Sequence, residues 1–149
     1  MKLQTDDFSC GPVAIINAYY NKHSEYPKNM SIKRLTHICE TNQEYGTYRW
    51  NIKKNPIIKL EKSVYNTKKI LGMKRFILLY SFSFSNRVCA HYIFVEKDND
   101  IYKLYNYFYS DENNYVNRSM DKFSFIEKLI KNNPTTDDEL DYPVAWEIV

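Results

Sequence analysis

The sequence predicts an α+β domain in which helices come first and an antiparallel sheet follows. Two observations support this fold class. Up to Gly72, apolar side chains recur at helical spacing, and from Lys74 onward strand-like apolar runs alternate with turn residues. No internal repeat or linker interrupts the chain. A length of 149 residues is sufficient for one hydrophobic core, so we expect a single domain over residues 1–149.

The predicted helix nearest the N-terminus begins at Cys10 and ends near Asn21. Pro12 suits its first turn, because the fixed φ of proline is tolerated there. Asp7 and Ser9 are residue types that cap helix N-termini. The helix is apolar nearly all round, which is typical of a helix buried centrally.

Three shorter segments follow with helical patterns. Ser31 is expected to cap a helix whose apolar positions have helical spacing: Ile32, Leu35, Ile38 and Cys39. Thr47–Lys54 predicts a short helix that stops at Asn55, because the residue before a proline is disfavoured in a helix. Ser63 is a candidate cap for a third helix, which Gly72 would end.

Three strands are predicted next, with the sequences RFILLYSFSF (75–84), CAHYIFVEK (89–97) and DIYKLYNYFY (100–109). Turn residues between them, at Asn86-Arg87 and Asp98-Asn99, indicate an antiparallel meander.

The last third of the chain adds one helix and one strand. The helix should run from about Asp121 to Asn132, and the closing strand from Val144 to Ile148. The helix has apolar residues expected on one side: Phe123, Ile126, Leu129 and Ile130.

The composition is that of a soluble globular protein, with 44% hydrophobic and 26% charged residues. The net charge of +3 is spread along the chain among acidic residues, so we expect no nucleic-acid partner. No apolar run is long enough to cross a bilayer and no secretory signal begins the chain, so we expect no membrane partner and a cytoplasmic location. Three cysteines, an odd number, fit a reducing compartment.

Cys10 is the candidate nucleophile, with Gln4 six positions ahead of it. A cysteine reacts as thiolate, and the unpaired N–H groups at a helix N-terminus favour that anion. Gln4 would then lie beside the thiol as a stabiliser of the oxyanion. The alternative is that Cys10 is a small core residue and Gln4 a loop residue, since free cysteines are often buried.

His91 is the histidine best placed for chemistry, and its expected partner is Asn106. If Asp98-Asn99 is a two-residue hairpin loop, Lys97 pairs with Asp100 and His91 lies opposite Asn106. Residues directly opposed on adjacent strands have Cβ atoms roughly 4.5–5.5 Å apart, so the side-chain amide oxygen could accept the imidazole N–H.

Other candidates fit this site less well. Asp98 and Asp100 lie at the hairpin tip, about 20 Å from His91 at 3.3 Å per residue, and Asp111 has the wrong parity. Surface or structural roles suit His23 and His37 better.

A zinc site formed by Cys10, Cys89 and His91 is one interpretation of these residues, and a role for Cys89 and Cys39 in the core is the other. No paired ligand spacing supports the zinc site, so we expect no metal and no cofactor.

Together, Gln4, the Cys-Gly-Pro at Cys10, His91 in AHYIFVE and Asn106 resemble the papain-like cysteine peptidases, most closely the C39-like peptidase group. The resemblance implies a papain-like (C39-like) fold, with the nucleophile helix packed on an antiparallel sheet. It also implies that Cys10 attacks, that Gln4 and the Cys10 N–H form the oxyanion hole, and that His91 acts as base and then acid. Asn106 would orient His91.

Two departures from that family limit what carries over. C39-like sequences usually have aspartate followed by proline where this chain has Asn106-Tyr107, although asparagine is usual in papain-like enzymes. C39 domains often precede a transporter, and this chain contains no transporter segment. The resemblance therefore implies a thiol hydrolase that cuts a peptide or isopeptide bond, with preference for glycine before the cut.

Its substrate would be a peptide or protein, with a diglycine or ubiquitin-like tail as a candidate. Two alternatives stay open. One is a transferase that uses the same thioester chemistry, and the other is a binding protein on a peptidase scaffold that has lost turnover.

Overall fold

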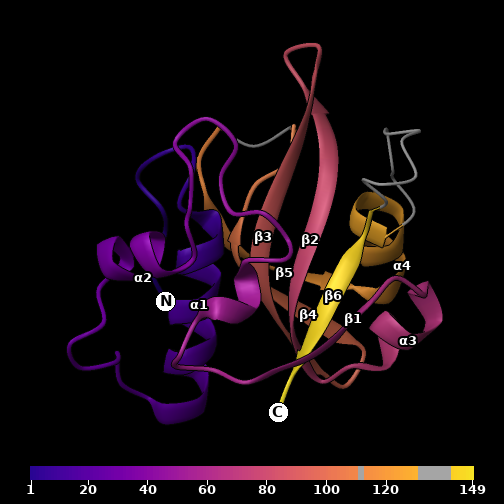
Figure 1. Cartoon of the computed structure of the whole chain (residues 1–149). Helices are drawn as coiled ribbons and strands as arrows, with labels where there is room; N and C mark the ends of the chain where they lie inside the picture. Colours follow the sequence, from indigo (N-terminus) through magenta and orange to yellow (C-terminus); the bar gives the residue numbers. More distant parts are fainter. Residues whose placement is uncertain (111–112, 131–141) are drawn as a thin grey trace.

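The protein is described by a computed structural model, which covers residues 1–110, 113–130 and 142–149. It contains a six-stranded antiparallel sheet with strand order β1-β6-β2-β3-β4-β5 and helices on both faces (Figure 1). The predicted α+β class is therefore confirmed. The strands are β1 (Leu60–Val64), β2 (Arg75–Phe84), β3 (Arg87–Asp98), β4 (Ile101–Tyr107), β5 (Val116–Asp121) and β6 (Val144–Ile148).

The helical elements divide into two groups on opposite faces of the sheet (Figure 1). One group comprises α1 (Cys10–His23), α2 (Ile32–Ile38) and the 3-10 turn η1 (Ile52–Lys54). The other comprises α3 (Thr67–Gly72), α4 (Lys122–Phe125) and the π-helical turn η2 (Ile126–Ile130). Each group buries its own apolar cluster against the strands, so the molecule has two cores separated by the sheet.

Helix α1 begins at Cys10, as the sequence predicts, and continues to His23. Every residue from Cys10 to Ala18 is buried, which confirms the interpretation of an apolar helix buried all round. Asn17 is the polar exception in that buried stretch. Its side chain accepts a hydrogen bond from the Lys2 N–H (2.8 Å) and donates one to the Lys2 carbonyl (2.9 Å), so it ties the N-terminal segment to α1.

The predicted capping of α1 by Asp7 and Ser9 is wrong. Ser9 is the N-cap residue, but its side chain makes no capping hydrogen bond. Asp6 stabilises this end instead, because its Oδ1 accepts the N–H groups of Phe8 (2.9 Å) and Ser9 (2.8 Å). The carboxylate therefore shapes the turn before the helix and leaves the first helical N–H groups available.

Two predictions for the segment after α2 are corrected by the structure, and strand pairing explains the second. Ser31 caps α2 as predicted, accepting from the Arg34 N–H. Only η1 forms within the predicted helix Thr47–Lys54. Ser63 caps nothing, because it lies in β1 opposite Trp146 of β6, a partner eighty-three residues away that no local pattern reveals. Asn66 caps α3 in its place.

The predicted C-terminal helix is shorter and wound differently. Asp121 caps α4, which passes directly into η2, and this change of pitch alters which side chains face the sheet. Phe123, expected inside, is 74% exposed, whereas Phe125 is fully buried. The predicted end at Asn132 lies outside the described residues. The closing strand over Val144–Ile148 is confirmed, and β5 was not predicted.

Both hairpin turns lie one residue away from their predicted positions. The β2–β3 turn is Ser85-Asn86, both with positive φ, and the β3–β4 turn is Asn99-Asp100. Asp98 therefore pairs with Ile101, and the predicted pairing of Lys97 with Asp100 is wrong. A one-residue shift at a turn moves the register by two.

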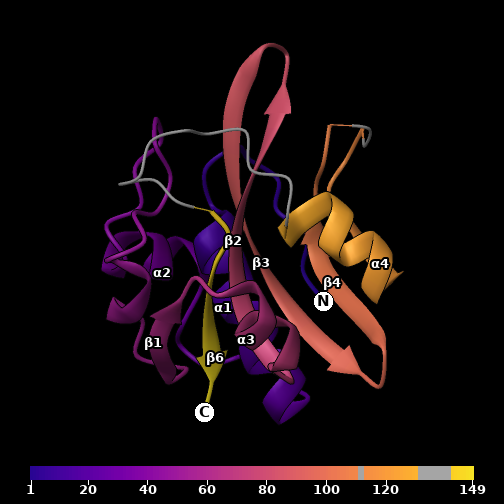
Figure 2. The ribbon, with the colours of Figure 1, turned by 90° about the vertical axis from the view of Figure 1, so that its right-hand side faces the viewer.

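The pairing of β4 with β3 ends before it reaches His91. The last pair is Phe94 with Tyr105, and Asn106 then turns the chain away with a φ of +66°. Asparagine is among the residues that tolerate this left-handed conformation. The predicted direct opposition of His91 and Asn106 is therefore wrong. The first half of β3 continues with β2 alone, as a hairpin that projects beyond the sheet (Figures 1 and 2).

Candidate active site

The N-terminus of α1 meets β3 near the point where β4 turns away. Backbone N–H groups of Tyr92, Gly11 and Cys10 lie around the Sγ of Cys10 and favour its thiolate form. Tyr92 directly follows His91. The fold therefore brings the start of α1 to the part of β3 that contains His91, although Cys10 and His91 are eighty-one residues apart in the sequence.

Gly11 is required by the close approach of a neighbouring loop. A Cβ at this position would lie 2.6 Å from Thr47 Oγ1 and 3.0 Å from Thr47 Cβ, which is closer than real Cβ atoms come. Thr47 is fixed in turn, because its carbonyl accepts the Tyr92 hydroxyl at 2.9 Å and its own hydroxyl bonds that of Thr41. The glycine of the Cys-Gly-Pro sequence thus permits the 44–50 loop to lie beside Cys10.

The Cys10 thiol is neutral in the resting protein. Burial raises its pKa to about 11, and the three backbone N–H groups lower the pKa by less than burial raises it. The helix N-terminus was expected to favour the thiolate, and its N–H groups do lower the pKa of Cys10, but burial raises that pKa more. A thiolate would form at this position only if a base took the proton.

The His91 ring is oriented by a backbone carbonyl. Its Nε2 lies 2.6 Å from the carbonyl oxygen of Asn106. A carbonyl only accepts, so Nε2 carries the hydrogen and Nδ1 remains the basic nitrogen. The prediction that the Asn106 side chain would accept this bond is wrong, although His91 and Asn106 do meet. Among the described residues, no hydrogen bond links the ring to Cys10 Sγ.

Two tyrosines enclose the imidazole. The Tyr80 ring stands edge-on to it with centroids 5.8 Å apart, and the Tyr115 ring lies at 5.5 Å. His91 is 4% exposed in this setting. Burial lowers its pKa to about 4, against the smaller raising effect of the Asn106 carbonyl. At neutral pH the ring is therefore uncharged, which is the form that acts as a general base.

This shift predicts a pH-dependent stability. Unfolded His91 takes up a proton below about pH 6.5, whereas the folded ring does so only near pH 4, so stability is lost as the pH falls between these values. His91→Gln should remove that loss, which amounts to about 2 to 3 kcal/mol between pH 7 and 4.5. Urea unfolding of wild type and variant at both pH values measures it. Equal pH slopes for the two proteins would contradict the shift.

Asn106 connects the histidine to Gln4. Its carbonyl binds His91, and its N–H donates to Asn117 Oδ1 at 3.0 Å. Its side-chain Oδ1 accepts the Gln4 backbone N–H at 2.9 Å, and its Nδ2 donates to Gln4 Oε1 at 2.6 Å. All of its polar atoms are therefore bonded, and the residue is fully buried.

This network fixes which way the Gln4 amide points. Because Asn106 Oδ1 must accept from the Gln4 backbone N–H, the Asn106 atom facing the Gln4 side chain is the donor Nδ2. Gln4 therefore turns Oε1 toward Asn106 and Nε2 the other way, where one N–H donates to the Asp6 carbonyl at 2.8 Å. An amide NH₂ has two donors, so the second N–H can serve a ligand.

A groove of about 730 Å³ opens beside Cys10. The 44–50 loop forms one wall, Asp7 and Cys10 border it, and residues 87–90 of β3 line the other side. Tyr48 and Trp50 stack within that loop at 4.8 Å, and Trp50 is 68% exposed. The sulfur is thus buried among protein atoms yet borders a cavity wide enough for a peptide.

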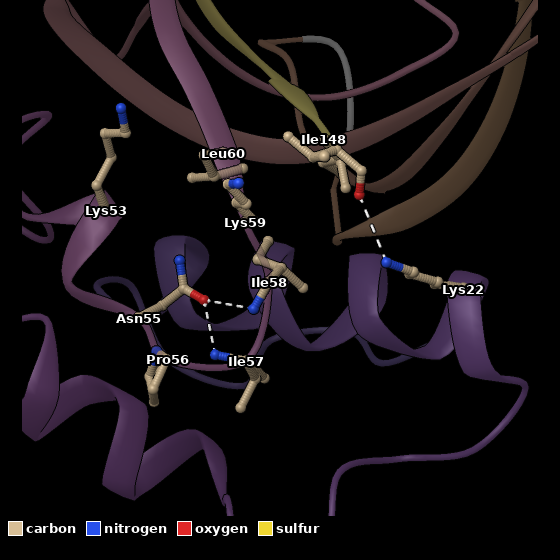
Figure 3. A pocket seen from close by; sticks show the side chains of 10 residues that line it. Lys22, Lys53, Asn55, Pro56, Ile57, Ile58, Lys59, Leu60 and Ile148 are labelled. Atoms are coloured by element: carbon tan, nitrogen blue, oxygen red, sulfur yellow. Dashed lines mark hydrogen bonds between the residues drawn. The ribbon is translucent and has the colours of Figure 1, made fainter.

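A second cavity, of about 440 Å³, lies at the far end of α1 (Figure 3). Lys22 in the last turn of the helix lines it, and its Nζ bonds the Val149 carbonyl at 3.5 Å. Asn55 forms another part of its wall and accepts the N–H groups of Ile57 and Ile58 (Figure 3). Lys22 is twelve residues from Cys10, about 18 Å at 1.5 Å per residue, so this cavity is separate from the thiol.

The remaining histidines and cysteines lie elsewhere. His23 and His37 are exposed on α1 and α2, Cys39 is fully buried, and Cys89 is half-buried at the groove. Within residues 1–110, 113–130 and 142–149, no group of three or more histidine, cysteine or acidic side chains is arranged to hold a metal. In the same ranges, no helix has the length and apolar character needed to cross a bilayer.

Several residues of the site were missed by sequence reasoning. An aspartate shortly before a helix was a usable signal for Asp6, and a lone asparagine in an apolar helix was one for Asn17. Tyr80 and Tyr115 carried no signal, because tyrosine is abundant throughout the chain. Asp111, rejected as an orienting residue, lies outside the described residues.

Comparison with known proteins supports the fold. No protein-family model matches the chain, and no curated protein does. A solved structure described as the peptidase domain of Streptococcus ComA, a bifunctional ABC transporter involved in a quorum-sensing pathway, matches with a TM-score of 0.63. The match covers 99% of this chain and 95% of that chain at 15% sequence identity. The chain therefore has the fold of a C39-type cysteine peptidase domain, as predicted from the residues around Cys10 and His91.

Proposed function

We propose that this protein is a thiol hydrolase that cleaves a peptide or isopeptide bond at Cys10. The observation that carries the proposal is the Asn106 network, which holds Gln4 and His91 in one buried unit beside the helix end that presents the thiol. A purely structural role gives no reason to orient a buried imidazole with its basic nitrogen left over. The peptidase fold supports the same reading.

The mechanism starts from a neutral pair. As substrate approaches, His91 Nδ1 takes the Cys10 proton while the sulfur attacks the carbonyl carbon. The second N–H of Gln4 Nε2 and the Cys10 backbone N–H stabilise the oxyanion. His91 then protonates the leaving amine, the C–N bond breaks, and water activated by His91 hydrolyses the thioester. The Asn106 carbonyl accepts from Nε2–H throughout and stabilises the transient imidazolium.

The substrate is proposed to be a peptide or protein with glycine before the cut, such as a diglycine or ubiquitin-like tail. A transferase would share every step up to the thioester and differ in the nucleophile that resolves it. A binding protein without turnover would not need the network of Gln4, Asn106 and His91 to orient an imidazole.

Covalent labelling tests the proposal. Wild type is treated with acetyl-Gly-Gly-vinyl sulfone, and the adduct is located by digestion and mass spectrometry. We expect modification at Cys10 in preference to the half-buried Cys89, at a rate well above that of Cys10 in the urea-unfolded chain. Labelling of folded Cys10 no faster than in the urea-unfolded chain would contradict an organised catalytic thiol.

A further inference from the structure

Within the part of the chain that the structure describes, the first half of β3 is paired on one side only. Arg87 to Ile93 pair with β2, but the pairing with β4 begins only at Phe94. In an antiparallel pair, successive residues direct their N–H and C=O groups alternately to the two sides. Phe84 and Arg87 close the two-residue turn between β2 and β3 as a hydrogen-bonded pair, so the Tyr92 N–H, five positions beyond Arg87, points away from β2 and toward Cys10 Sγ.

By the same alternation, Ala90 and Val88 direct their backbone groups to the side that Tyr92 uses. Across residues 1–110, 113–130 and 142–149, no segment other than β2 forms a backbone hydrogen bond with either residue. Both residues are exposed, Val88 by 57%, and both line the groove that contains Cys10. A row of available donors and acceptors thus leads from the thiol along the groove. Such an edge is a template for an added strand.

The proposed chemistry decides which part of a substrate lies on this edge. His91 must reach the leaving amine to protonate it, and His91 belongs to β3. The segment that follows the cleaved bond is therefore on the β3 side of the thiol. Running from Tyr92 toward Arg87, it is antiparallel to β3. The distance from Tyr92 to Val88 is about 13 Å at 3.3 Å per residue, which is enough for four substrate residues.

We propose that the substrate segment after the cleaved bond adds to β3 as an antiparallel strand, hydrogen-bonded to Ala90 and Val88. This inference rests on the proposed function. It assigns the substrates to chains that are extended beyond the cut, rather than helical or compact there. Side chains on one face of the added strand meet the wall that carries Tyr48 and Trp50, so apolar residues at alternate positions are favoured.

Acyl transfer tests this edge, because the acceptor amine occupies the site of the leaving amine. Acetyl-Gly-Gly p-nitrophenyl ester acylates Cys10 and releases p-nitrophenol. An acceptor amine then attacks the thioester carbonyl, the C–S bond breaks, the thiol regains its proton and a new amide forms. We expect the acceptor Gly-Val-Tyr-Val-amide to compete with water at least tenfold better than glycinamide. Of two analogues N-methylated at successive amides, only one should lose the advantage.

The protein side of the test uses Ala90→Pro and Ala90→Val. Proline at position 90 removes an N–H that points away from β2, and proline is tolerated at such positions on a sheet edge. Valine retains that N–H. Ala90→Pro should reduce the preference for the tetrapeptide over glycinamide by about 3- to 10-fold, the value of one hydrogen bond. Ala90→Val should retain the preference.

The outcomes separate the two proposals. A p-nitrophenol burst with equal use of the tetrapeptide and glycinamide overturns the added strand and leaves the hydrolase intact. The same holds if both N-methylated analogues behave alike. If no p-nitrophenol is released above the uncatalysed background, the proposed function fails and the added strand fails with it.

Discussion

Cys10→Ser should reduce turnover of acetyl-Gly-Gly p-nitrophenyl ester to the uncatalysed background. The hydroxyl of serine is far more weakly acidic than a thiol, and a neutral imidazole whose pKa burial holds near 4 cannot activate it. Loss of a nucleophile from a catalytic unit typically costs on the order of 10⁴- to 10⁶-fold in rate. Steady-state release of p-nitrophenol measures the effect.

The matched controls are the other two cysteines. Cys39→Ser and Cys89→Ser should retain the wild-type rate, because neither sulfur lies at the N-terminus of α1. His91→Ala should lower the turnover rate nearly as much as Cys10→Ser does. The double variant should be no slower than either single variant, because the two residues act as a unit. If Cys10→Ser retained turnover, a residue other than Cys10 would have to be the nucleophile.

Gln4→Ala should lower kcat by on the order of 100-fold or more, because it removes a donor to the oxyanion. The structure adds a second consequence. The Nδ2 of buried Asn106 would lose its acceptor, which costs about 1 to 3 kcal/mol of stability. Initial rates and urea unfolding of the same preparations measure both effects. A variant with unchanged kcat would exclude Gln4 from the oxyanion site.

Asn106 provides the companion test. Asn106→Gly keeps the positive φ and the backbone carbonyl that binds His91, and it removes only the contacts with Gln4. Its effect on kcat should therefore resemble that of Gln4→Ala. The fold-reduction in kcat of the double variant should be clearly smaller than the product of the two single fold-reductions. Multiplicative losses would indicate that the Asn106 side chain acts on the histidine independently of Gln4.

The preference for asparagine at position 106 has a physical reason that the sequence alone does not reveal. An ionised aspartate could accept the Gln4 N–H but could not donate to Gln4 Oε1, and it would turn that amide around. Asparagine keeps Gln4 Nε2 directed away from Asn106. The departure from the usual aspartate is thus compatible with an ordered site, because a carbonyl orients the His91 ring.

Local signals predicted the fold well wherever burial and spacing act within one element. The start of α1 at Cys10, the cap at Ser31 and the strands around His91 all follow from short-range patterns. Ser63 was misassigned because its strand exists only through pairing with distant β6. The candidate residues were found from their motif, whereas their contacts depend on where β4 leaves the sheet.

The register shows how a small local error changes the chemistry assigned to a site. Placing the turn at Asp98 rather than Asn99 opposed His91 to an asparagine side chain. The true register ends the pairing earlier, and the positive φ of Asn106 brings its carbonyl to the ring instead. Asp98 and Asn99 both suit a hairpin turn and cannot be ranked from sequence. The sequence therefore could not show whether Asn106 binds His91 through its side chain or its carbonyl.

The most direct measurement is the detection of the covalent intermediate. Wild type mixed with acetyl-Gly-Gly p-nitrophenyl ester is quenched in acid within milliseconds, digested, and mapped by mass spectrometry. We predict an acetyl-diglycyl thioester on Cys10 of wild type at this early time. In His91→Ala the thioester should appear only when the reaction is quenched after minutes, and in Cys10→Ser it should be absent. An acyl group on any other residue, or none on Cys10 while p-nitrophenol is released, would contradict the account.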